Sequence, residues 1–393
     1  MIGLAAATKA VFRYRRPRPW CWEVVVKAVC DETHAGRDAD LAVTQAGPAV
    51  SAHADRIAVS LGKGLGPVDA LTLALAGMGD LRALPGLRRL ARERPLSYDR
   101  PHARILAALP AAELLPVLLP SLRRKPERHY TSSPMLEPLV AWGTAAAPAV
   151  PEVVPYLDTP YPYDALRALG RIGPPAAVAA DRMAAYATGR RDVPPGRHIA
   201  RRAAWAHWRV TGEPTLALDV CGAAVRSGTA SHGLPFLADL GPPAAAHADP
   251  VRGLMESPGA WTRVAAAHAY WRITGDPEPA VPVLLAEVDP AWAGNPAMPV
   301  REAVHRLGEI GAPAAAAASR LRSVLAREER LTHPFVGVRV LADEVYVRTL
   351  TVALERIAAG EDGGPVPPPA LEPVPAPVPT VRQRLMLRPG RSR

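Results

Sequence analysis

Cysteine, lysine and phenylalanine are scarce in this chain of 393 residues, and long uncharged apolar runs are absent. The three cysteines form no C-x-x-C pair and no disulfide framework, which excludes a stapled secreted domain and suits a reducing compartment. No stretch reaches about 18 apolar residues without a charge, so we expect no membrane-spanning helix. The apolar run at 24–26, behind Arg15 and Arg16, is too short for a secretory or twin-arginine signal. The sequence therefore predicts a cytoplasmic protein without a membrane partner.

The local motifs of common nucleophilic and phosphate-binding sites are also missing. No G-x-S-x-G elbow occurs, and the S-x-x-K match from Ser60 to Lys63 lacks its S-D-N and K-T-G companions. Residues 62–66 do not form a Walker A loop, because Ile57 replaces the first glycine of that motif and Gly64 replaces its Ser or Thr. These absences predict a non-enzymatic chain with no catalytic residue.

Histidine spacing predicts no metal site either. The two His-Ala-Asp triplets, at 53–55 and 247–249, place their polar residues two positions apart. On a helix that spacing turns the side chains about 200° apart, so neither pair can chelate a metal. Glu302 and His305 share a helix face, but one such pair is only a fragment of a site. We expect no metal ion and no cofactor.

The charge balance is basic, at +10 with a pI near 9.9, and lysine supplies only four of the 47 basic residues. Such a balance is typical of nucleic-acid partners, but an excess of Arg, Ala and Pro is also what a GC-rich genome encodes. Basic clusters lie at 13–18, 88–94, 123–128 and 190–202. Gathered on one face they would form a groove for phosphates. Spread out, they are solvated helix-end arginines whose stems cover Ala-rich surface, which is the interpretation we favour.

What the chain has in abundance is alanine, interrupted at regular intervals by glycine and proline. The recurring boundary glycine, usually followed by proline, stands at Gly47, Gly79, Gly143, Gly173, Gly212, Gly241, Gly275 and Gly311, with Pro110 in its place once. Eight steps from the first to the last give 33 residues per repeat, a period typical of arrays of short structural units. Glycine favours the end of one helix and proline the start of the next. The unit is predicted to be helix, tight turn, helix.

The helix before the glycine is apolar on more than one side. In 199–210, positions 199, 203, 206 and 210 form one stripe, while Ala204 and Trp208 lie roughly opposite. We therefore expect these helices to be sandwiched between neighbours rather than to lie on a surface.

These units resemble HEAT repeats, in particular the short HEAT-like repeats named after the phycobilisome lyases. The matching segments are 168–176, 305–314 and two Trp-Arg units described below, and the resemblance covers about 38–360. It implies an all-α fold, a right-handed α-solenoid of about nine helix pairs. Tetratricopeptide and ankyrin signatures are absent. The His-Glu dipeptides of the HEAT-like deoxyhypusine hydroxylases are absent as well, so no iron ligands are carried over.

The composition divides the chain into three parts. Residues 1–37 fit no repeat and are interpreted as an N-terminal extension or cap, 38–360 form the repeat array, and 361–393 read as a Pro-rich disordered tail with a basic end.

Two near copies, AWAHWRVTGEPTLAL at 204–218 and AHAYWRITGDPEPAV at 267–281, raise the question of a duplicated site. We favour one structural part used twice, with Trp filling space between helices and Arg near a helix C-terminus. The candidate binding residues are Arg88, Arg89, Arg123, Arg124, Arg201, Arg202, Trp208, Arg209, Trp271 and Arg272.

The resemblance implies a protein-protein interaction scaffold that uses the concave surface of the solenoid. In HEAT arrays the second helix of each pair tends to line that surface, which makes 114–122, 150–157 and 281–288 candidate strips. The alternative is a nucleic-acid-binding solenoid, similar to the HEAT-like DNA glycosylases, with an Arg-rich groove.

Overall fold

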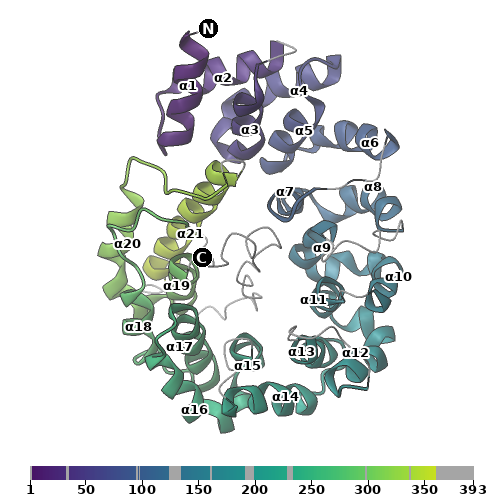
Figure 1. Cartoon of the computed structure of the whole chain (residues 1–393), viewed down its shortest axis with the longest axis vertical. Helices are drawn as coiled ribbons and strands as arrows, with labels where there is room; N and C mark the ends of the chain where they lie inside the picture. The colour runs from purple at the N-terminus through teal and green to yellow at the C-terminus, as the bar shows by residue number, and fades with distance from the viewer. Residues whose placement is uncertain are drawn as a thin grey trace, which may run out of the picture.

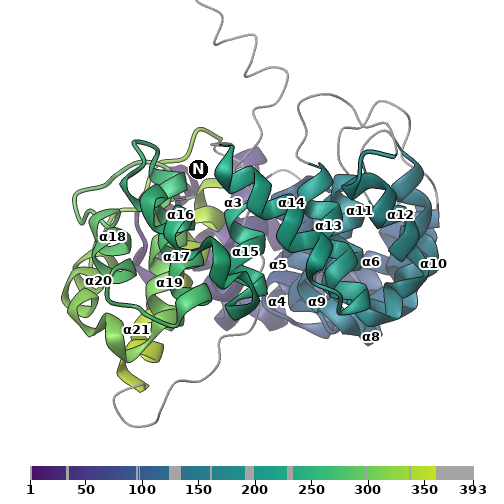
Figure 2. The same ribbon diagram turned by 90° about the horizontal axis from the view of Figure 1, so that it is seen from below.

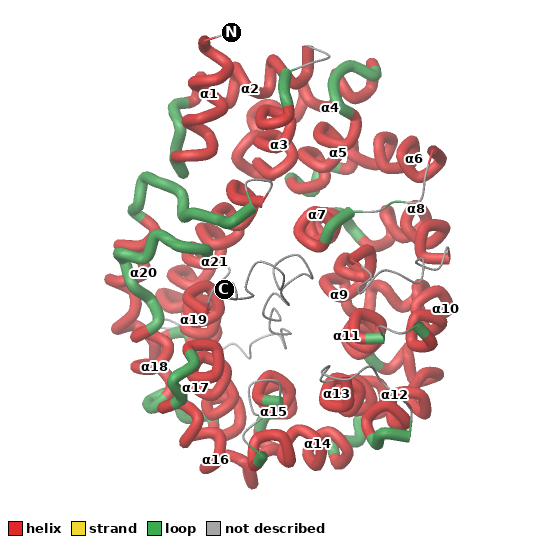
Figure 3. Tube along the Cα trace, viewed as in Figure 1, coloured by secondary structure: helices red, strands yellow, loops and turns green. Residues whose placement is uncertain are grey.

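The computed structural model describes residues 2–31, 35–93, 96, 98–123, 134–159, 162–190, 199–227, 233–296, 299–335 and 338–359. All regular structure in these ranges is helical, apart from one isolated β-bridge between Tyr14 and Glu329 (Figure 3). The expected all-α fold is confirmed for this part of the chain. No helix within it combines the length and apolarity needed to cross a membrane. The tail expected at 361–393 and the candidate Arg124 lie outside the described residues.

The helices follow one another around a closed ring in two layers (Figure 1). The inner layer contains α3 (Arg37–Ala46), α5 (Val68–Gly77), α7 (Arg100–Ile105), α9 (Glu137–Trp142), α11 (Tyr163–Ile172), α13 (Ile199–Thr211), α15 (Leu234–Leu240), α17 (Ala260–Thr274), α19 (Pro299–Ile310) and α21 (Arg339–Ala359). The outer layer contains α4 (Ala54–Lys63), α6 (Leu84–Glu93), α8 (Ala111–Arg123), α10 (Val150–Val153), α12 (Ala180–Ala187), α14 (Thr215–Arg226), α16 (Ala248–Gly253), α18 (Ala280–Ala286) and α20 (Ala318–Leu325). Seen from the edge, the ring is a single tier of helices (Figure 2).

The expectation that the second helices line the concave surface is wrong. The strips at 114–122, 150–157 and 281–288 belong to α8, α10 with its following turn, and α18, all in the outer layer (Figure 1). The physical reason is crowding, because neighbouring helices lie closer together on the inner circumference of a ring than on the outer one. Small residues suit the inner position: a Cβ on Gly308 of α19 would lie 2.7 Å from the Cα of Ala353 in α21.

The inner helices are sandwiched as their apolar pattern predicts. In α13 all four residues of the 199, 203, 206 and 210 stripe are buried, and so is Ala204 on the other side. Trp205, which is fully buried, fills the gap to the preceding helix, where its ring lies over Gly170 of α11. One apolar core therefore runs through the whole ring.

The eight boundary glycines all have positive φ, as expected of helix ends. Only part of the expected geometry holds, however. Gly275 is left-handed with φ 77° and ψ −3°, whereas Gly173 has φ 78° and ψ −142°, the mirror image of extended backbone. Gly47, Gly143, Gly241 and Gly311 share that second conformation. It turns the chain directly into the Pro-containing first turn of the outer helix, and a side chain would be strained there.

The ring closes where the first helices meet the last one. α1 (Ile2–Arg13) and α2 (Pro19–Asp31) precede α3, and α21 packs against both α1 and α3. Asp343 of α21 is fully buried and accepts hydrogen bonds from Arg15 (3.0 Å) and Arg330 (3.2 Å). Gln45 of α3 accepts a hydrogen bond from the backbone N–H of Val340 (3.0 Å). The segment expected to be an extension or cap thus contains two helices, and the ion cluster beside it joins both ends of the chain.

Candidate functional site

The candidate arginines expected to mark a binding face are spread over both layers. Arg88 and Arg89 are exposed on α6, and Arg89 faces Glu93 at 3.3 Å. Arg123 is exposed at the end of α8, where it forms an ion pair with Glu152 at 3.0 Å. All three lie in the outer layer, away from the opening (Figure 1).

Arg201 and Arg202 lie in the inner layer, on α13. The Arg202 guanidinium lies 4.1 Å from the ring centroid of Tyr163, donates to the Tyr163 hydroxyl at 2.7 Å, and lies 5.3 Å from the ring of Phe236. The side chain is buried, so these cation–π contacts join α11, α13 and α15 instead of facing a ligand. Burial lowers the pKa of Arg201, and nearby Cys221 only partly offsets this effect.

The two Trp-Arg units make the same contacts. Arg209 lies over the ring of Trp208 and donates to the carbonyl of Gly170, three residues before the boundary glycine of α11. Arg272 lies over Trp271 and donates to the carbonyl of Ala238, three residues before the boundary glycine of α15. Each arginine places positive charge at the negative C-terminus of the preceding inner helix. This repeated contact agrees with one structural part used twice.

A charged cluster that the sequence did not reveal joins α7, α9 and α11. Glu137 is buried and accepts from Arg167 (2.7 Å), from Arg104 (2.9 Å) and from Arg100, which also donates to Asp164 at 2.8 Å. Burial raises the pKa of Glu137, but the three arginines outweigh it and bring that pKa down to about 2. Glu137 therefore stays ionised, and its partners are held in place.

A second cluster occupies α17 and α19. Arg306 is buried between Glu302 and Glu309, and His268 Nε2 lies 3.4 Å from Glu309. Burial and then the charge of Arg306 lower the pKa of His268 to about 4, against the attraction of Glu309. Burial and Arg306 also lower the pKa of His305, whose Nε2 lies 3.5 Å from Glu309. Both imidazoles are neutral near pH 7.

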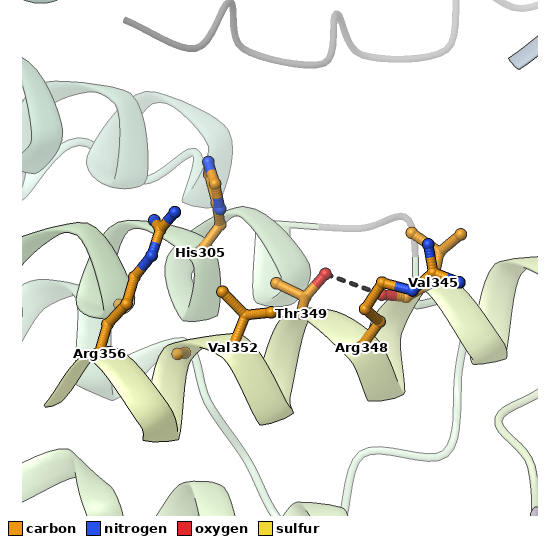
Figure 4. Close-up of a pocket in the computed structure, with 8 residues that line it drawn as sticks. His305, Val345, Arg348, Thr349, Val352 and Arg356 are labelled. Carbon is orange, nitrogen blue, oxygen red and sulfur yellow. Dashed lines mark hydrogen bonds between the residues drawn. The ribbon is translucent and has the colours of Figure 1, made fainter. Parts of the chain in front are cut away.

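A pocket of about 200 Å³ lies between α19 and α21 (Figure 4). It is lined by His305, Gly308, Val345, Arg348, Thr349, Val352, Ala353 and Arg356. In the close-up, His305 and Arg356 stand at one end and Arg348 at the other, with Thr349 and Val352 between them. The Thr349 hydroxyl donates to the carbonyl of Val345 at 2.8 Å.

This pocket faces the opening of the ring. Arg301, His305 and Gly308 follow one another at helical spacing and therefore share one stripe of α19. The pKa of Arg301 is lowered mainly by burial and also by the charge of Arg104, which belongs to α7 on the other side of the opening (Figure 1). The stripe that continues into the pocket is thus directed inward.

The chemistry available in these sites is that of recognition. Among the described residues no three His, Cys, Asp or Glu side chains gather in a way that could hold a metal ion. Burial raises the pKa of the Cys221 thiol to about 12, which leaves it a poor nucleophile. The clusters instead present guanidinium and imidazole groups, which bind anions. No protein-family model matches the chain, and no curated protein shows significant sequence similarity to it.

Proposed function

We propose that the chain is a right-handed HEAT-like α-solenoid of about nine helix pairs, closed into a ring, which acts in the cytoplasm as a non-enzymatic scaffold. Nine inner helices from α3 to α19 are each followed by an outer helix, and the boundary glycines recur between them. Arrays of this kind present extended surfaces to protein partners, so partner binding is the function that the architecture supports best.

The observation that carries this proposal is the pairing of the charges in the inner layer. Arg100, Arg104 and Arg167 share Glu137 and Asp164 in ion pairs. Buried pairs of this type stabilise a fixed arrangement of helices and leave no reactive group in an unusual protonation state for chemistry. The result is a rigid ring with a shallow pocket rather than a catalytic cleft.

The alternative function, nucleic-acid binding, needs arginines gathered along one groove. The exposed candidates Arg88, Arg89 and Arg123 lie in the outer layer, whereas Arg202, Arg209 and Arg272 contact neighbouring inner helices. Phosphate recognition by a solenoid depends on a continuous positive face, and this distribution favours the scaffold.

A tagged pull-down from the native host, with and without nuclease, tests the proposal. A scaffold retains a discrete set of protein partners after nuclease treatment. Recovery of nucleic acid, or the loss of all partners on nuclease treatment, contradicts the scaffold and supports a nucleic-acid-binding ring.

A further inference from the structure

α21 differs from the other inner helices because no outer helix follows it among the described residues. One of its faces is therefore not covered by a pair partner. Along that face Val345, Arg348, Thr349, Val352 and Arg356 follow one another at the spacing of a single helical stripe, and all five line the pocket. Val345 is 38% exposed, which is unusual for a large aliphatic side chain in this protein.

The two arginines of this stripe also stand apart electrostatically. Arg100, Arg167 and Arg306 in the inner layer each have a carboxylate partner, whereas within the described part of the chain no ion pair occurs at Arg348 or Arg356. Eight residues separate them, which places their Cα atoms about 12 Å apart along the helix. The aliphatic surface of Val352 lies between these two positive charges (Figure 4).

Groups around the pocket strengthen its preference for negative charge. His305 stands beside Arg356, and Arg301 lies on the same stripe of α19 as His305. Glu302 and Glu309 are close in sequence, but both are engaged with Arg306 at the back of α19. The net charge of +10 adds a long-range attraction for acidic partners.

We propose that the groove along α19 and α21 binds an acidic amphipathic helix of a protein partner, with aliphatic residues seated on Val345 and Val352 and two carboxylates meeting Arg348 and Arg356. Carboxylates about two turns apart on the bound helix match the separation of the arginines. Insertion of an amphipathic helix into such a groove is a common recognition mode. This inference rests on the proposed scaffold function and specifies the chemistry of one of its partners.

The test uses the full chain and a fluorescein-labelled helical peptide of about four turns, with two glutamates two turns apart flanking a Leu/Val face. Binding is followed by fluorescence anisotropy at about 0.15 M salt. We expect saturable binding that weakens about 10-fold or more when both glutamates of the peptide are replaced by glutamine. The double variant Arg348→Glu/Arg356→Glu is expected to lose about 10-fold or more as well.

A matched control separates this groove from general charge attraction. Arg88 and Arg92 are exposed on α6 in the outer layer, and Arg88→Glu/Arg92→Glu changes the net charge of the protein by the same amount. This control is expected to keep the affinity within about twofold. If charge reversal on α21 unfolds the chain, as judged by circular dichroism, Arg348→Gln/Arg356→Gln gives the same comparison more gently.

Three outcomes overturn the inference. The peptide does not bind, both double variants weaken binding equally, or a single-stranded oligonucleotide displaces the peptide at equal concentration. The scaffold itself has a separate readout. If Arg348→Glu/Arg356→Glu still captures the full set of nuclease-resistant partners from the native host, this groove is not their binding site and the scaffold proposal stands.

Discussion

Asp343 is the residue on which ring closure depends most directly. It is fully buried and receives the guanidinium groups of Arg15 and Arg330, together with the backbone N–H of Leu331 at 3.1 Å. In Asp343→Ala, Arg15 keeps only the carbonyl of Val324 at 2.7 Å as a printed partner of its guanidinium, while Arg330 keeps Glu344. Removal of one partner from a buried ion pair costs about 3–5 kcal/mol, because the remaining charge stays desolvated.

The consequence is expected to concentrate at the junction of the two chain ends. Hydrogen exchange of α1 and of the first turns of α21 is expected to accelerate by two orders of magnitude or more, since about 1.4 kcal/mol corresponds to a factor of ten. Helices on the far side of the ring, such as α11 and α13, keep their protection because each contacts only its neighbours. Small-angle scattering is expected to show a larger radius of gyration as the ring opens.

Glu329→Ala is the matched control. Glu329 also pairs with the N-terminal segment, through Arg13 at 2.8 Å, but both side chains are about half exposed. Surface pairs of this kind contribute about 0–1 kcal/mol, so exchange at the junction is expected to change little. Equal effects of the two substitutions, or an even loss of protection throughout the ring in Asp343→Ala, would refute the assignment of closure to the buried cluster.

Three further predictions concern the inner layer. Because the folded-state pKa of Glu137 lies near 2, below its ordinary value of 4.5, its stabilisation of up to about 3 kcal/mol is complete above that ordinary value and is lost as the pH falls toward 2. Urea unfolding at stepped pH measures this loss, and Glu137→Gln is expected to flatten the profile. Gly170→Ala places a Cβ 2.3 Å from the ring of Trp205 and is expected to lower stability by about 1–3 kcal/mol. Much of that cost is expected to disappear in a Trp205→Leu background, and strict additivity of the two changes would contradict the clash. Arg209→Ala and Arg272→Ala each remove one helix-end contact, so each is expected to cost about 0.5–1.5 kcal/mol in unfolding experiments, and clearly unequal costs would argue against equivalent parts.

The helix boundaries were predictable because local chemistry determines them. A glycine that ends a helix needs positive φ, and a proline suits the next first turn, so the Gly-Pro spacing alone located the helix ends. The all-α class followed from alanine abundance and the two-sided apolar pattern, which the burial of α13 confirms. The prediction of Gly173 as simply left-handed was wrong, since φ and ψ at a turn depend on how the next helix packs.

The candidate site was much less predictable, because its residues are brought together only by the ring. Glu137 and Arg167 are 30 positions apart, close to one repeat, and their contact follows from the stacking of adjacent inner helices. A search for charged residues one repeat apart on equivalent helix positions would have found this pair. No such signal points to Arg15 and Asp343, which are 328 positions apart and meet only because the array curves back on its start.

Closure also explains why these ends carry buried charge. An open array of helix pairs needs polar caps at both ends, since each terminal unit would otherwise expose an apolar face. In this chain α1, α3 and α21 cover one another instead, and apolar helix faces alone would tolerate several registers of contact. Asp343 accepts from two arginines and a backbone N–H at once, an arrangement that a shift of one helical turn would break. The buried cluster therefore fixes the register of closure, and with it the position of α21 and its exposed stripe at the opening of the ring.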